Sequence, residues 1–108
     1  IAQVAILAVR EHLQERPLPG GVYHLTCRGE TSWCGFARTI IDEASNAGVA
    51  LNMGSDRVFP ISTRDFRAAA PRPSNSRLDV SRIEQALHLS LPQWPEALGT
   101  TLTDWMKE

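Results

Sequence analysis

The chain has 108 residues, of which 43% are hydrophobic, and its 11 basic and 12 acidic side chains give a formal charge of −1. A chain of this length builds one modest core, so we expect one domain or part of one. Charges of both signs are mixed along the sequence, which argues against a nucleic-acid-binding protein or one that binds anionic membranes. No apolar run approaches the ~20 residues that span a bilayer, and we expect a soluble, cytoplasmic protein.

Two cysteines, Cys27 and Cys34, are the only thiols of the sequence. They form no Cys-x-x-Cys motif and no histidine pair accompanies them, so neither a disulfide framework nor a zinc site is indicated. We expect free thiols in a reducing compartment.

The first sixteen residues place apolar side chains at helical spacing from Ile1 to Leu13. This pattern predicts a largely buried helix. No capping residue precedes Ile1, so we expect the helix to begin upstream of this sequence. The prolines and glycines of residues 17–21 end the helix, and the strand-favouring run at 22–26 follows as a predicted strand.

The clearest amphipathic helix is predicted from an apolar stripe at 3- and 4-residue spacing, made of Trp33, Phe36, Ala37, Ile40, Ile41 and Ala44. Thr31 or Ser32 is expected to cap its first turn. Gly48 lies just beyond its end, where a left-handed residue closes many helices. We expect Trp33 to pack in the core rather than to stack on a base.

The rest of the chain predicts short elements. Residues 49–53 are a weak extended stretch, and 58–62 an edge strand, because Pro60 cannot donate a ladder hydrogen bond. Residues 67–77 hold two prolines and no period, which predicts an irregular loop.

Two further helices are predicted near the end of the chain. Asp79 can cap a short helix with Val80, Ile83 and Leu87 on its apolar face. Pro92 and Pro95 open a last helix with Ala97, Leu98, Thr101, Leu102 and Trp105 directed inward. The expected order is α, β, α, β, β, α, α, which is a small α/β unit.

Three segments carry a resemblance to a known family: GVYHLTCRGETSWCGFA at 21–37, PRPSNSRLD at 71–79 and LSLPQWPEAL at 89–98. In order and spacing they resemble the C-terminal half of the dTDP-4-dehydrorhamnose reductase family, whose members are extended short-chain dehydrogenases/reductases. The resemblance implies an α/β fold that is the C-terminal substrate-binding part of such an enzyme, with the NAD(P)-binding Rossmann-like core largely absent. Residues 1–27 would then be the last helix and strand of the Rossmann part, and 28–108 a small α/β substrate-binding domain.

In this family, the resemblance implies, an N-terminal Rossmann domain binds NADPH and a Tyr-x-x-x-Lys pair delivers the proton while hydride goes to the keto carbon of the sugar. This sequence departs from that pattern. Its only tyrosine, Tyr23, has Cys27 four residues on, its only lysine is Lys107, and no glycine-rich turn follows a strand. We therefore predict no catalytic and no NADPH-binding residue here, and no activity for the chain alone.

The segment PRPSNSRLD is where we expect ligand contact. A planar guanidinium can pair two oxygens of a diphosphate, which favours Arg72, with Asn75, Ser76 and Arg77 as further substrate-binding candidates for sugar or ribose hydroxyls. The alternative is that both arginines pair with local carboxylates while Asn75 and Ser76 make turn hydrogen bonds.

The resemblance implies that the whole protein reduces dTDP-4-dehydro-L-rhamnose to dTDP-L-rhamnose, with NADPH held by the missing N-terminal part. It also makes a homodimer possible, and Mg²⁺ at a dimer contact, although no carboxylate cluster of this sequence places that ion. The alternative is a non-catalytic binding or regulatory subunit, because the regulatory subunit of methionine adenosyltransferase resembles the same family.

Overall fold

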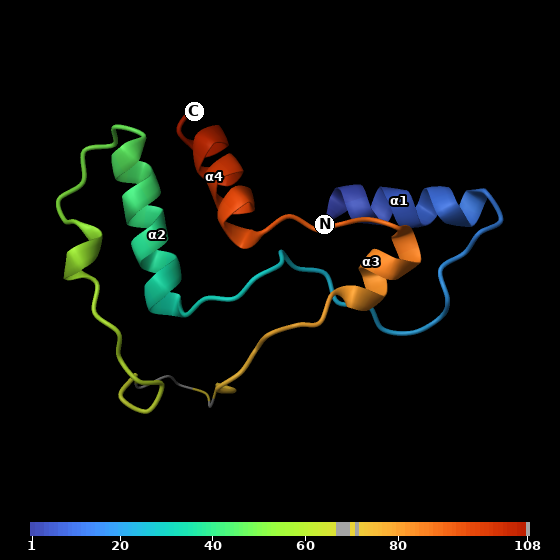
Figure 1. The fold of residues 1–108 in the computed structure, drawn as a ribbon, viewed down its shortest axis with the longest axis horizontal. Helices are drawn as coiled ribbons and strands as arrows, with labels where there is room; N and C mark the ends of the chain where they lie inside the picture. Colours follow the sequence, from blue (N-terminus) through green and yellow to red (C-terminus); the bar gives the residue numbers. More distant parts are fainter. Residues whose placement is uncertain (67–69, 71, 108) are drawn as a thin grey trace. The chain divides into compact units, whose positions relative to one another are not determined.

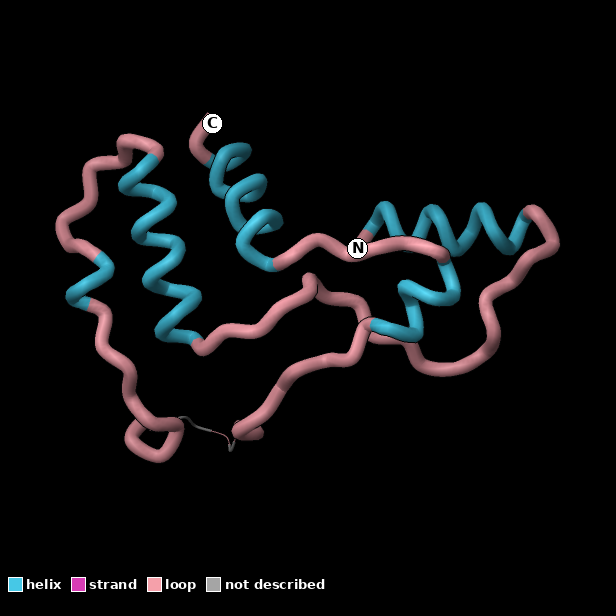
Figure 2. Tube along the Cα trace, viewed as in Figure 1, coloured by secondary structure: helices cyan, strands magenta, loops and turns pink. Residues whose placement is uncertain are grey.

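The computed structural model describes residues 1–66, 70 and 72–107. Within these residues every regular element is helical, as Figure 1 shows, and no strand is formed (Figure 2). The elements in chain order are α1 (Ala2–Leu13), α2 (Trp33–Asn46), the 3-10 turn η1 (Ser55–Arg57), α3 (Ser81–Leu87) and α4 (Trp94–Trp105).

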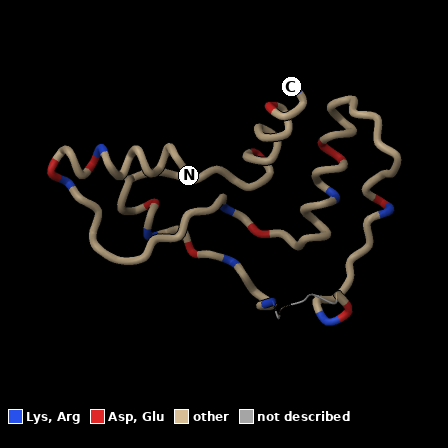
Figure 3. The backbone as a smooth tube through the Cα atoms, turned by 180° about the vertical axis from the view of Figure 1, so that it is seen from behind, with Lys and Arg blue, Asp and Glu red and all other residues tan. Residues whose placement is uncertain are grey.

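The chain forms two compact units. Unit 1 consists of Ile1–Arg28 and Arg77–Pro92, and unit 2 of Gly29–Ser76 and Gln93–Glu108. Basic and acidic residues are interspersed along the backbone of each unit (Figure 3). The functional boundary after residue 27 that the resemblance implies stays a prediction.

The expected strands at 22–26, 49–53 and 58–62 are not formed, and the α/β fold is therefore not confirmed by the structure. A strand exists only when its backbone pairs with a neighbour. Residues 22–27 do alternate like a strand, with Tyr23, Leu25 and Cys27 half-buried and their neighbours exposed. However, no partner strand lies beside them among the described residues.

The expectation that the first helix is largely buried is wrong for this structure. None of the residues of α1 is buried, and Ile6 and Val9 are 66% and 59% exposed. Val4, Ala8 and Glu11 are half-buried, and the other residues of α1 are exposed. The helical spacing was sufficient to predict the helix, but the described residues cover only part of its apolar side.

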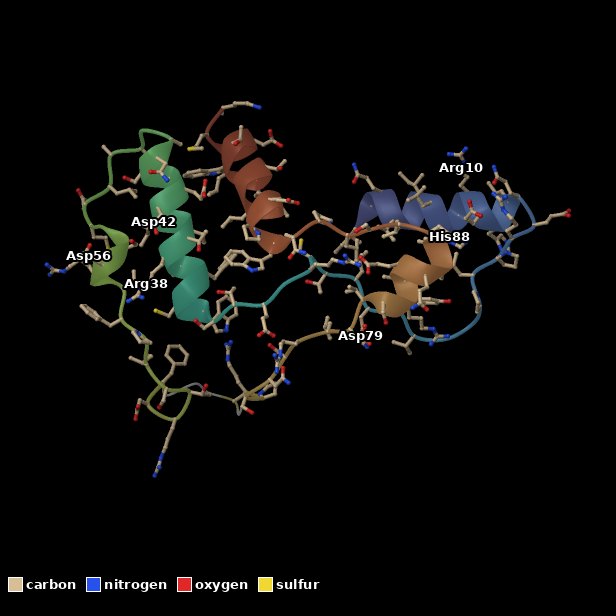
Figure 4. All side chains as sticks on the ribbon, in the orientation of Figure 1. Arg10, Arg38, Asp42, Asp56, Asp79 and His88 are labelled. Carbon is tan, nitrogen blue, oxygen red and sulfur yellow. The ribbon has the colours of Figure 1, made fainter. Side chains whose placement is uncertain are left out.

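Helix α3 supplies the best-buried side chain of unit 1, Ile83, at 5% exposure. The Asp79 carboxylate accepts the N–H of Ser81, the first residue of α3, at 2.9 Å, while the N-cap position itself is taken by Val80. This hydrogen bond holds the pKa of the Asp79 carboxyl below its ordinary value. His88 ends the helix in the left-handed region, with φ 48°, and Figure 4 labels Asp79 and His88 at the two ends of α3.

Unit 2 is built on the packing of α2 against α4, where the rings of Phe36 and Trp94 lie 5.8 Å apart. Ala44 on α2 is buried. The Ser32 hydroxyl accepts the N–H of Gly35 at 3.0 Å, which confirms the expected cap. Pro95 lies in the first turn of α4, as its position in the sequence predicts.

Two tryptophans do not take the core positions expected for them. Trp33 is 80% exposed and Trp105 is 68% exposed. Trp33 is the first residue of α2, and its indole meets the Phe36 ring in a T-shaped arrangement, with the ring centres 6.4 Å apart. No helical turn of α2 precedes Trp33, so the apolar stripe of the helix ends at this ring.

The segment after η1 is held to α2 by an arginine. The Nε and Nη2 atoms of Arg38 donate to the carbonyl oxygen of Val58 at 3.0 and 2.6 Å. Figure 4 labels Arg38 and Asp42 on α2 and Asp56 on η1. This contact fixes the start of residues 58–62 by a side chain instead of a β-ladder.

Two glycines of unit 2 are expected to respond to alanine with opposite signs. Gly48 has φ +85° beyond the end of α2, where the N–H of Val49 bonds to Ala44 O at 3.0 Å. An added Cβ meets no atom within 4 Å at Gly48 or at Gly99 inside α4. We therefore expect Gly48→Ala to destabilise by about 1 to 2 kcal/mol, from left-handed strain alone.

Gly99→Ala should instead stabilise by about 0.5 to 1 kcal/mol, because alanine loses less backbone entropy in a helix. Denaturant unfolding of the two variants measures the difference directly. Shifts of the same sign would contradict the backbone geometry assigned to Gly48.

Candidate functional site

The four predicted ligand residues lie on an exposed segment without helix or strand. Arg72, Asn75 and Ser76 belong to unit 2, and Arg77 begins the second part of unit 1. Each is therefore placed within its own unit only. Residues 67–69 and 71 of the predicted loop lie outside the described residues.

The predicted ligand residues differ in their partners. Among the residues that the structure describes, Arg72 makes no hydrogen bond or ion pair, so no described carboxylate competes for its guanidinium. Asn75 and Arg77 each have an interaction partner. The role of all four in ligand binding stays a prediction.

A buried carboxylate joins three segments of unit 1. Glu84 on α3 is 8% exposed, and its Oε2 accepts from Nη2 of Arg28 at 2.6 Å. Its Oε1 accepts the backbone N–H of Leu91 at 2.7 Å. The N–H of Arg28 in turn donates to Pro92 O at 2.9 Å. We call these three residues, Arg28, Glu84 and Leu91, the Glu84 cluster.

The Glu84 cluster favours the charged forms of both side chains. The hydrogen bond from Arg28 and that from the Leu91 N–H hold the pKa of the Glu84 carboxyl below its ordinary value of 4.5. The same pairing raises the pKa of Arg28. The stability that the ionised carboxylate adds is therefore complete above pH 4.5 and is lost as the pH falls through the lower folded-state pKa.

An arginine of α3, Arg82, holds the loop that follows α1. The guanidinium of Arg82 donates to Gly20 O at 2.8 Å and to Val22 O at 3.2 Å, and it lies 4.7 Å from the centre of the Tyr23 ring. A Cβ on Gly21 would approach this guanidinium to 2.6 Å. Glycine at 21 therefore allows the close approach of Arg82 to the backbone.

Gly20 and Gly21 do not form a dinucleotide cradle. Such a cradle needs glycines that lead into the N-terminus of a helix, so that amide groups face phosphate. Here Gly20 and Gly21 follow the end of α1, and Arg82 occupies the space beside Gly21. In the same described ranges no group of three His, Cys, Asp or Glu side chains is arranged to hold a metal ion.

The single tyrosine and the single lysine do not form a catalytic pair. The Tyr23 hydroxyl donates to Pro19 O at 2.5 Å, and its ring lies under Arg82. Lys107 lies at the end of the chain, 3.3 Å from Asp104. In this structure Tyr23 is a packing residue of the loop after α1.

Sequence reasoning missed Glu84 and Arg82. A signal for Glu84 was present, because it lies four residues after Val80 and next to Ile83, on the apolar side of a predicted helix. A carboxylate on such a face needs a partner. The partner, Arg28, is 56 residues away in the sequence and carried no signal of its own. Among the described helices, none is long and apolar enough to cross a membrane.

The described residues thus form helices and an exposed segment that carries Arg72. A family model described as the RmlD substrate binding domain matches residues 1–106. The chain therefore belongs to the RmlD substrate-binding domain family.

Curated relatives share one name, dTDP-4-dehydrorhamnose reductase. The chain is 34% identical to the protein from Salmonella typhimurium over 104 residues, which is 96% of this chain and 34% of the relative. It is 36% identical to that of Aggregatibacter actinomycetemcomitans over 98 residues, 91% of this chain and 33% of the relative. The protein from Burkholderia thailandensis is 34% identical over 88 residues, 82% of this chain and 30% of the relative. The chain spans about a third of the length of these relatives.

Proposed function

We propose that the protein containing this chain is an oxidoreductase that reduces dTDP-4-dehydro-L-rhamnose to dTDP-L-rhamnose in dTDP-rhamnose biosynthesis, and that this chain supplies its substrate-binding side. The observation that carries the proposal is the match to the RmlD substrate binding domain over residues 1–106, together with the common name of the curated relatives. NADPH is the proposed hydride donor. We assign NADPH binding to the remainder of the protein, because Gly20 and Gly21 of this chain do not form a dinucleotide cradle. The proposed compartment is the cytoplasm.

Within this function, Arg72 is the proposed diphosphate ligand. Its side chain is exposed and has no partner among the described residues, so binding need not break an existing ion pair. A guanidinium can donate two parallel hydrogen bonds to a diphosphate. Asn75, Ser76 and Arg77 are proposed to bind hydroxyls or oxygens of the same ligand.

The test is an assay of the complete, purified protein with NADPH and dTDP-4-dehydro-L-rhamnose. Oxidation of NADPH that depends on the keto sugar, with dTDP-L-rhamnose as the product, supports the reductase. Binding of the sugar nucleotide without oxidation would instead identify a non-catalytic binding subunit. If the protein neither binds the sugar nucleotide nor oxidises NADPH in its presence, the proposal is overturned. Light scattering of the same preparation measures whether the protein is a homodimer.

A further inference from the structure

The two units are joined by three connections. The chain leaves unit 1 after Arg28, returns to it at Arg77 and leaves it again after Pro92. The segment proposed to bind the sugar nucleotide, 72–77, contains the second of these connections. How unit 1 holds the ends of the connections therefore bears on that segment.

All three ends are attached to α3. Arg77 reaches α3 through residues 78–80, and Asp79 caps the first turn at 2.9 Å. The other two ends are held by Glu84, whose carboxylate takes the side chain of Arg28 at 2.6 Å and the N–H of Leu91 at 2.7 Å. The hydrogen bond from the Arg28 N–H to Pro92 O, at 2.9 Å, joins these two ends to each other.

Glu84 is buried, whereas the side chain of its partner Arg28 is 45% exposed. An ion pair whose basic partner stays in contact with solvent adds little to stability by itself. Gln85, the next residue on α3, is exposed and takes no part in the Glu84 cluster. Glu84 instead fixes the positions of two segments relative to α3, because its two carboxylate oxygens accept hydrogen bonds from Arg28 and from Leu91.

We infer that Glu84 is a positioning residue for sugar-nucleotide binding. It holds Arg28 and Leu91, which lie at the ends of two connections, against α3, and residues 78–80 join α3 to the end of segment 72–77. This inference rests on the proposed function. Without Glu84, α3 is held less firmly in unit 1 and segment 72–77 is less ordered before binding. The conformational entropy that the segment then loses when the ligand binds makes the free energy of binding less favourable. Glu84 is buried and both of its carboxylate oxygens accept hydrogen bonds within unit 1, so its loss weakens binding and leaves the chemical step unchanged.

The test compares Glu84→Ala, Glu84→Gln and the matched control Gln85→Ala in the complete protein. In Glu84→Ala we expect KM for the sugar nucleotide to rise roughly 5- to 30-fold with kcat and the KM for NADPH unchanged. Glu84→Gln keeps an acceptor for the Leu91 N–H but loses the charge, so its KM should lie between those of Glu84→Ala and wild type. Gln85→Ala should behave as wild type.

Hydrogen exchange on the same proteins provides a readout that does not depend on activity. Protection of the amides of Arg28 and Leu91 should be lost in Glu84→Ala and kept in Gln85→Ala. Unchanged protection would show that the cluster does not hold the two ends. If Glu84→Ala does not fold, Glu84→Gln decides: a raised KM in a folded protein supports the inference.

Two kinetic results would overturn the positioning role. One is a wild-type KM in a variant whose amides have lost protection, and the other is a fall in kcat with KM unchanged. A wild-type protein without reductase activity defeats the proposed function instead, and the exchange experiment still reports on the cluster. The two failures are therefore distinguishable.

Discussion

A preparation of these 108 residues alone, mixed with NADPH and dTDP-4-dehydro-L-rhamnose, is expected to oxidise no cofactor above the rate of a buffer blank. Positioned proton transfer contributes roughly 10²- to 10⁴-fold to such a rate, and correct placement of donor and acceptor contributes more. Neither contribution is expected from this chain alone, because it has no Tyr-x-x-x-Lys pair and the hydroxyl of its only tyrosine, Tyr23, donates to Pro19 O.

The control for this experiment is the complete protein under the same conditions, which should turn over. Absorbance of NADPH is followed in both samples. A rate proportional to the concentration of the 108-residue preparation would contradict the assignment of cofactor binding and proton delivery to the remainder of the protein.

Replacing Arg72 by alanine in the complete protein is expected to lower kcat/KM for the sugar nucleotide roughly 10- to 150-fold, which corresponds to the loss of a charge-assisted contact worth about 1.5 to 3 kcal/mol. The side chain is exposed and unpaired among the described residues, so the fold should keep its melting temperature. Arg72→Lys should recover only part of the activity, because an ammonium cannot make two parallel hydrogen bonds.

The competing role for Arg72 is to tie down its own loop, and it gives the opposite pattern. A loop anchor predicts a lower melting temperature with near-normal kinetics. Melting temperature and kcat/KM are therefore measured on the same Arg72→Ala protein. An unchanged kcat/KM would reject the diphosphate role.

The helices were predictable because their signals are local. Ser32 and Gly48 mark the two ends of α2, and the structure places both as expected, with the Ser32 cap at 3.0 Å and Gly48 at φ +85°. Pro95 likewise marks the first turn of α4. Capping and left-handed closure depend on a few neighbouring residues, so the sequence contains the information they need.

The expected strands and the burial of α1 failed because both depend on distant partners. Tyr23, Leu25 and Cys27 alternate as in a strand, but a ladder needs a second backbone. The same holds for Val9 and Leu13 on α1, which belong to the predicted apolar stripe and whose side chains are exposed. Hydrophobic periodicity predicts which face seeks a partner and does not supply the partner.

In the candidate site, too, local sequence signals allowed predictions, whereas contacts between distant segments did not. The segment containing Arg72 was predicted to bind ligand from its residues and its resemblance to a family, and that role stays a prediction. Glu84 was missed because its role arises from contacts with Arg28 and Leu91, and Arg28 is 56 residues away. A side chain that holds segments together is visible only when the segments are placed.

Whether this chain holds the sugar nucleotide is measured most directly by titrating dTDP-L-rhamnose and NADPH, separately, into the complete protein and its Arg72→Ala variant. We expect Kd for dTDP-L-rhamnose to rise roughly 10- to 150-fold and Kd for NADPH to stay unchanged. An unchanged Kd for dTDP-L-rhamnose, or an equal rise for both ligands, would contradict the assignment of this chain to the substrate side of a reductase.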